Sequence, residues 1–109
     1  MEKQIENKLP QIKQLFFKYG AVRAYLFGSA ATDSFNDNSD VDFLYAFRED
    51  LDYEEYANNY FNLLHDLENL LKKQIDLVAE KTLKNPFLIE SINENKIQLI
   101  WSEKKKSYC

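Results

Sequence analysis

The 109-residue sequence has few of the residues that mark several protein classes, with one cysteine, one histidine, two glycines and two prolines. Cys109, at the last position, has no second cysteine to pair with, which favours a reducing compartment. The first residues are charged and periodic, unlike a secretory signal, and no apolar run is long enough to span a membrane. A formal net charge of −4 gives no overall field that attracts nucleic acid. We therefore expect a cytoplasmic protein with no direct nucleic-acid or membrane partner.

Hydrophobic and aromatic residues are abundant. Hydrophobic residues make up 45% of the chain, including eight Phe and seven Tyr, which is too high a share for a disordered protein. The length suits one domain, too short for a catalytic and a substrate domain together. We assign residues 1–102 to a single domain and 103–109 to a polar C-terminal tail. The role of the basic cluster in that tail, Lys104 to Lys106, stays open.

Apolar periodicity predicts a first helix and four short strands. Ile5, Leu9, Ile12 and Phe16 share one helical face, and this helix should end near Gly20. Because proline removes a backbone donor, the helix is expected either to start around residue 10 or to be kinked there. Strands are expected at residues 22–27, 41–47, 74–78 and 96–101.

Two further helices are expected between these strands. Asp52 and Glu55 have the spacing of a capping box at the start of a long helix. The tyrosines at positions 53, 56 and 60 follow at helical spacing and are expected to pack in the core. A short helix should begin at Pro86, capped by Asn85, and Asn95 in a left-handed conformation is expected to end it after residue 94.

Two aspartates open the second predicted strand, in the stretch "AYLFGSAATDSFNDNSDVDFLYAF" (residues 24–47). Alternate strand residues share a face, so Asp40 and Asp42 should project together, with Cα atoms roughly 6.6 Å apart. Burying an unpaired carboxylate costs several kcal/mol, so both need a compensating partner. Mg²⁺ prefers carboxylate oxygens and leaves positions for phosphate and water. A metal between the two side chains would explain why they share a face.

Gly28 and Ser29 follow the first predicted strand directly. Glycine lets the backbone approach a ligand, serine supplies a hydroxyl, and a following helical turn presents N–H groups suited to phosphate. A third carboxylate, Asp76, interrupts the apolar strand "QIDLV", where it could hold a second ion or act as a general base. Each feature alone has an ordinary explanation, as a turn, a cap or an exposed edge residue. Their order along the chain indicates a site for a nucleoside triphosphate and metal.

This order, Gly28-Ser29, ten residues, Asp40-Val41-Asp42 and then Asp76, resembles the nucleotidyltransferase superfamily with the DNA polymerase β-like fold. More narrowly, the chain is similar to the minimal nucleotidyltransferases, or MNT proteins, over nearly its whole length. The resemblance implies an α/β (α+β) fold, in which helices pack a small mixed β-sheet.

The resemblance also implies a site and a partner. It assigns triphosphate binding to Gly28 and Ser29, and Mg²⁺ binding and catalysis to Asp40, Asp42 and Asp76. Many MNT proteins act as antitoxins to a HEPN-domain ribonuclease, in some cases by transferring AMP from ATP to a tyrosine of that toxin. The resemblance therefore implies an Mg²⁺- and ATP-dependent nucleotidyltransferase with a HEPN toxin as its partner.

The sequence departs from the family after the Gly-Ser turn. Where many members have a pattern like "GSRARG", this chain has Ala30 and Thr32, with Asp33 in place of the glycine. A non-catalytic antitoxin that neutralises its partner by contact therefore remains an alternative. Transfer to a small molecule such as an aminoglycoside would need a further substrate-binding subunit. Acceptor identity, nucleotide preference, the number of nucleotides transferred and the oligomeric state are not determined by the sequence.

Overall fold

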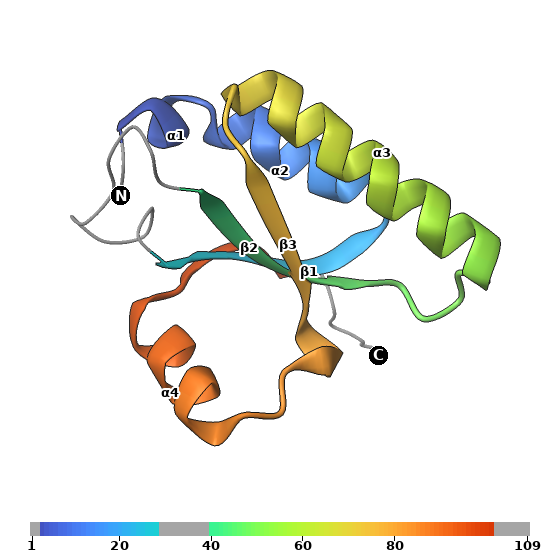
Figure 1. The fold of residues 1–109 in the computed structure, drawn as a ribbon. Coiled ribbons are helices and arrows are strands. Elements are labelled where there is room, and N and C mark those ends of the chain that lie inside the picture. The colour runs from blue at the N-terminus through green and yellow to red at the C-terminus, as the bar shows by residue number, and fades with distance from the viewer. Residues whose placement is uncertain (1–2, 29–39, 102–109) are drawn as a thin grey trace.

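The computed structural model describes residues 3–28 and 40–101, and this part of the chain contains both helices and strands (Figure 1). The elements are, in order, α1 (Lys3–Asn7), α2 (Leu9–Lys18), β1 (Ala21–Phe27), β2 (Val41–Phe47), α3 (Tyr53–Leu71), β3 (Ile75–Ala79), the 3₁₀ helix η2 (Glu80–Thr82), α4 (Pro86–Asn95) and β4 (Ile97–Trp101). All four predicted strands are therefore confirmed, within a residue at each end.

The strands form one mixed sheet in the order β3-β2-β1-β4. β1 lies at the centre, antiparallel to both β2 and β4, while β3 runs parallel to β2. The long helix α3 makes the crossover between these two parallel strands, which a short turn cannot connect. The expected α/β fold with a small mixed sheet is confirmed.

The two faces of the sheet are covered unequally. α2 and α3 lie together on one face, and α4 lies on the other (Figure 1). The larger core fills the first face and includes the fully buried Phe16, Phe43 and Leu63. A smaller cluster on the α4 face packs Ile92 of α4 against Tyr25 and Leu44 of the sheet. One side of the sheet is thus a packed core, and the other is only partly covered.

Capping signals set several helix ends. The Asp52 side chain accepts a hydrogen bond from the Glu55 backbone at 2.8 Å, which confirms the predicted capping box. Asn85 accepts from the Phe87 backbone at 3.0 Å, as expected at the start of α4. The prediction for Asn95 was wrong, because α4 includes this residue. Among the described non-glycine residues, the left-handed conformation belongs instead to Lys72, which ends α3.

The N-terminal segment confirms the expected helix start around residue 10, and a second short helix precedes it. It breaks at Lys8 into α1 and α2, and Pro10 lies in the first turn of α2. A proline is tolerated there because the first backbone N–H groups of a helix have no partner within it. The apolar stripe continues across the break, since Ile5 and Ile12 are both buried.

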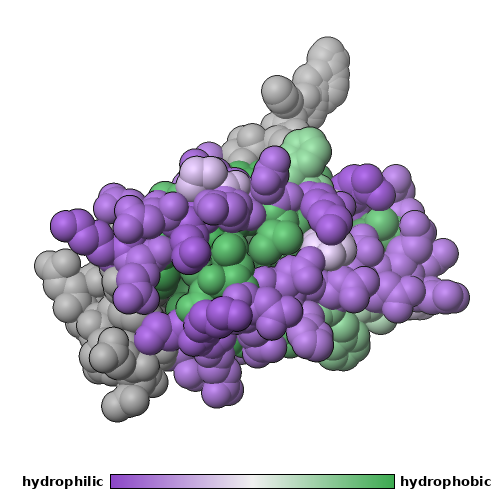
Figure 2. Space-filling view, turned by 90° about the horizontal axis from the view of Figure 1, so that it is seen from above, coloured by the Kyte–Doolittle hydropathy of each residue, from purple (hydrophilic) through white to green (hydrophobic). Residues whose placement is uncertain are grey.

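Polar contacts join α2 to α3. The Tyr19 hydroxyl donates a hydrogen bond to Asp66 at 2.6 Å. Seen from the side of these helices, hydrophilic side chains cover most of the surface, with apolar ones visible between them (Figure 2). Leu15 and Leu70 line a hollow on this side.

Two of the three tyrosines predicted in the core pack against it. Tyr56 and Tyr60 are partly buried there, and the Tyr56 hydroxyl lies 2.7 Å from that of the buried Tyr45. Tyr53 is 97% exposed, so its prediction was wrong. It is the first residue of α3, one turn before Tyr56, which does pack against the core. Within residues 3–28 and 40–101, no helix combines the length and apolar character needed to cross a membrane.

Candidate active site

Three strand ends meet at one edge of the sheet, where β1 ends and β2 and β3 begin. In the strand register, Asp42 lies opposite Phe27 on one side and Asp76 on the other. Neighbouring strands lie about 4.8 Å apart, and paired residues project to the same face. The two aspartates from distant parts of the sequence are therefore adjacent. Asp40 is exposed and lies two residues before Asp42, just outside β2.

Gly28 follows β1 at this same edge and has a φ of +74°. A Cβ atom on this residue would overlap the carboxyl group of Asp42, with its Cγ only 3.2 Å away. Glycine is thus required at this position for two reasons, its backbone conformation and the close approach of the carboxyl group. The turn after β1 and the start of β2 form one site.

The Asp42 carboxyl is half-buried, whereas Asp40 and Asp76 are exposed. Burial, and to a smaller extent repulsion from Asp76 and then from Asp40, together raise the pKa of Asp42 to about 6. Both causes penalise the ionised form. The site therefore concentrates negative charge where a cation would relieve it.

The donor atoms suit a hard divalent cation. Mg²⁺ is commonly held by one or two carboxylates and completes its shell with water and phosphate oxygens. In the described part of the chain, no three acidic, histidine or cysteine side chains are placed to hold a metal together. A site of one or two carboxylates that is completed by a nucleotide fits these residues better than a preformed three-carboxylate cage.

Not every predicted site residue falls in the described part. The structure brings Gly28, Asp42 and Asp76 together and places Asp40 near enough for its charge to act on Asp42. Ser29 lies outside the described residues, as does the loop containing Ala30, Thr32 and Asp33. Their assignments stay predictions.

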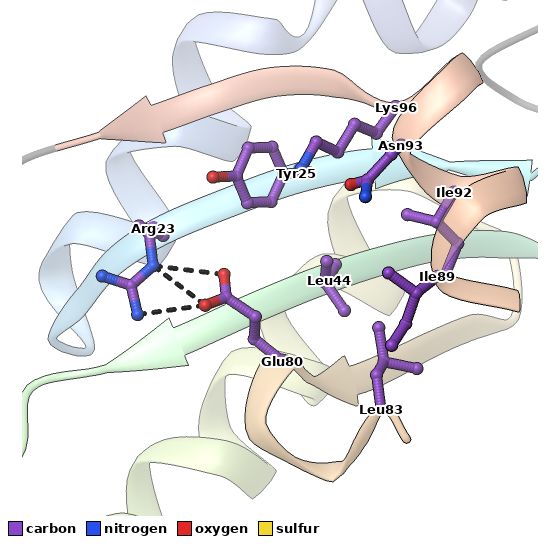
Figure 3. A pocket seen from close by; sticks show the side chains of 9 residues that line it. All are labelled: Arg23, Tyr25, Leu44, Glu80, Leu83, Ile89, Ile92, Asn93 and Lys96. Carbon is purple, nitrogen blue, oxygen red and sulfur yellow. Dashed lines mark hydrogen bonds and ion pairs between the residues drawn. The ribbon is translucent and has the colours of Figure 1, made fainter. Parts of the chain in front are cut away.

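A cavity of about 570 Å³ lies on the same face of the sheet, between the strands and α4 (Figure 3). Arg23 and Glu80 form an ion pair of 3.1 Å on one side of it, and Lys96 lies over the Tyr25 ring on the other. Sequence reasoning missed this cavity. The sequence does contain a signal for a site here, because Arg23 interrupts an apolar strand in the same way as Asp76 does.

The chain matches one family over most of its length. Residues 10–106 fit the family described as "Polymerase beta, Nucleotidyltransferase". Two proteins of Methanocaldococcus jannaschii are also similar. "Putative protein adenylyltransferase MJ1379" is 34% identical over 80 residues, which are 73% of this chain and 78% of the relative. "Putative protein adenylyltransferase MJ0128" is 36% identical over the same shares.

Solved structures have the same fold. A "putative minimal nucleotidyltransferase" superposes with a TM-score of 0.71 at 31% identity, covering 85% of this chain and 90% of the other. A chain from a toxin–antitoxin structure with AMP-PNP gives 0.67 at 23% identity, covering 89% and 75%. A chain from the complex of a tri-AMPylated Shewanella oneidensis HEPN toxin with its MNT antitoxin gives 0.62 at 21%, covering 94% and 76%. The last two are likenesses of fold. The chain therefore belongs to the polymerase β-type nucleotidyltransferase family.

Proposed function

We propose that this chain binds ATP with Mg²⁺ and transfers AMP to a tyrosine hydroxyl of a partner HEPN-domain toxin, acting as its antitoxin. The observation that carries the proposal is the half-buried Asp42 beside Asp76, with Gly28 against its carboxyl group. The names of the M. jannaschii relatives support AMP transfer to protein, and the HEPN–MNT complex supports the partner.

The carboxylates would bind the nucleotide through its cation. Asp40 and Asp42 would hold Mg²⁺ through their carboxylates, whose concentrated negative charge favours a cation. Bound there, Mg²⁺ supplies positive charge that stabilises the phosphates during transfer. Gly28 leaves room for the Asp42 carboxyl beside the turn, and Gly28 and Ser29 would contact the phosphate chain through the backbone and the serine hydroxyl. These residues would thus orient the α-phosphate before the acceptor arrives.

The neighbouring strand provides the remaining carboxylate. The acceptor oxygen forms a bond to the α-phosphorus while the bond from that phosphorus to the bridging oxygen breaks, and pyrophosphate leaves with the electron pair. Asp76 would accept the hydroxyl proton or hold a second ion. It is exposed at the strand edge next to Asp42, so an acceptor can reach it.

The test is transfer of label from α-³²P-ATP. Purified protein is incubated with Mg²⁺ and labelled ATP, with and without the HEPN-domain partner protein. We expect label on the partner, lost in Asp42→Asn and retained in Asp50→Asn, a control in an exposed surface ion pair. Transfer by Asp42→Asn would contradict the site assignment.

A non-catalytic antitoxin is the second candidate, favoured by the missing basic residues after the Gly-Ser turn. It predicts a stable complex, no label, and full protection from the toxin when Asp40 and Asp42 are both replaced. AMP transfer predicts label with the wild-type chain, and loss of both label and protection in the double variant.

A further inference from the structure

We propose that the cavity between the sheet and α4 is the acceptor subsite, which takes the tyrosine side chain to be modified. This inference rests on the proposed function. It adds the place on the molecule where the acceptor binds and the residues that hold it.

The first argument is the position of the cavity along the strands. On this face, Phe27, Asp42 and Asp76 form one row of paired residues, and Tyr25, Leu44 and Val78 form the next. The rows are about 6.6 Å apart because each strand advances two residues. Tyr25 and Leu44 line the cavity. The cavity therefore begins one row from the aspartates, a distance comparable to the length of a tyrosine side chain.

The second argument is the direction of attack. In phosphoryl-group transfer, the attacking and leaving oxygens lie roughly in line on opposite sides of the phosphorus. The leaving pyrophosphate is assigned to the turn at Gly28, beyond the end of β1. The acceptor must then approach from the opposite side, along the strands. The cavity lies on that side.

The third argument is the chemistry of the lining. Leu44, Leu83, Ile89 and Ile92 are apolar, and Tyr25 adds an aromatic ring. This surface suits an aromatic ring with a polar tip, whereas a serine or threonine side chain would leave it largely uncovered. The volume of about 570 Å³ is within the range of small-ligand sites.

Polar groups at the sides suit a protein acceptor. Figure 3 shows the Arg23–Glu80 ion pair on one side, with Asn93 and Lys96 from the α4 end of the chain on the other. Asn93 is exposed, so it is available to the backbone of an incoming segment. The arrangement offers an apolar slot for one ring between groups that can bind the flanking chain.

The test places a bulky side chain in the cavity from α4. Ile89 is partly buried in the cavity wall, and the next residue, Glu90, is exposed outside it. Ile89→Trp should lower kcat/KM for AMP transfer to the partner protein at least tenfold, and Glu90→Trp should change it less than twofold. Binding of a fluorescent ATP analogue should stay within twofold of the unmodified protein in both variants, and circular dichroism checks the fold.

A second pair of variants fills the cavity from a different segment of the chain. Leu83→Trp should reduce transfer as Ile89→Trp does, while Lys84→Trp, at the exposed neighbour, should not. This pair decides the matter if the first cavity variant fails to fold. Unchanged transfer in the cavity variants, with the unmodified protein active, would overturn the acceptor subsite alone. Equal losses in nucleotide binding would assign the cavity to the nucleoside instead. No transfer by the unmodified protein would refute the proposed function and this inference with it.

Discussion

Replacing Asp42 with Asn is expected to make the protein more stable while it abolishes AMP transfer. The wild-type carboxyl is ionised near neutral pH although burial and two neighbouring carboxylates penalise its charge. Asparagine keeps the size of the side chain and removes the charge. A residue retained for catalysis against its own cost in stability should respond in this way.

The magnitude follows from the pKa of Asp42, which rises from 3.8 to about 6 in the folded protein. A rise of about two pH units corresponds to about 3 kcal/mol. Because the side chain is only half-buried, solvent screening reduces the expected gain to about 1 to 2 kcal/mol. The raised pKa means that the folded state binds the proton more tightly than the unfolded state does. The penalty is therefore complete above about pH 6 and disappears below about pH 4.

The assay is urea unfolding of both proteins in EDTA at pH 7.5 and at pH 4. At pH 7.5 the free energy of unfolding of Asp42→Asn should exceed that of the wild type, and at pH 4 the two should agree. The Asp50 side chain is 78% exposed, so Asp50→Asn should have the same free energy of unfolding as the wild type at both pH values. A variant that is less stable than the wild type at pH 7.5, or a gain that does not depend on pH, would refute the electrostatic account of the site.

The remaining predictions compare matched pairs. Gly28→Ala should abolish AMP transfer, because its Cβ would displace Asp42. Gly20→Ala has similar backbone strain of about 1 to 2 kcal/mol, but its Cβ would make only ordinary contacts at 3.7 Å, so this variant should retain transfer. Retained activity in the first variant would show that the contact does not matter. Tyr56→Phe removes the partner of a buried tyrosine hydroxyl and should lower the unfolding free energy by about 1 kcal/mol. Tyr53→Phe, at a 97% exposed position, should leave the unfolding free energy unchanged. Thermal unfolding of both variants measures this difference, and equal effects would argue against the hydroxyl pair.

Much of the fold follows from local sequence signals. The bounds of β2, Val41–Phe47, are those predicted, because polar residues flank an apolar run that only Asp42 interrupts. The capping box at Asp52 depends on residues only three positions apart. Local patterns of this kind need no knowledge of the rest of the molecule. Pro10 likewise predicted the start of α2, but the separate helix α1 was not predictable in this way, since the apolar stripe runs from Ile5 into α2 without interruption.

The site is only partly local. The pattern around Gly28 and Asp42 could be recognised in the sequence, but the overlap between a Gly28 Cβ and the Asp42 carboxyl depends on how β1 pairs with β2. The adjacency of Asp42 and Asp76 depends on the register of two parallel strands joined by a long helix. The pairing of Arg23 with Glu80 likewise joins residues far apart in sequence. Long-range packing, not composition, determines all three.

The most direct test of the account is mass spectrometry of the partner protein after incubation with ATP, Mg²⁺ and this chain. The account predicts one or more AMP groups on partner tyrosines, and none when Asp42→Asn replaces the wild type. An unmodified partner in a stable complex with the wild-type chain would contradict catalysis. Equal modification by both proteins would contradict the assigned site.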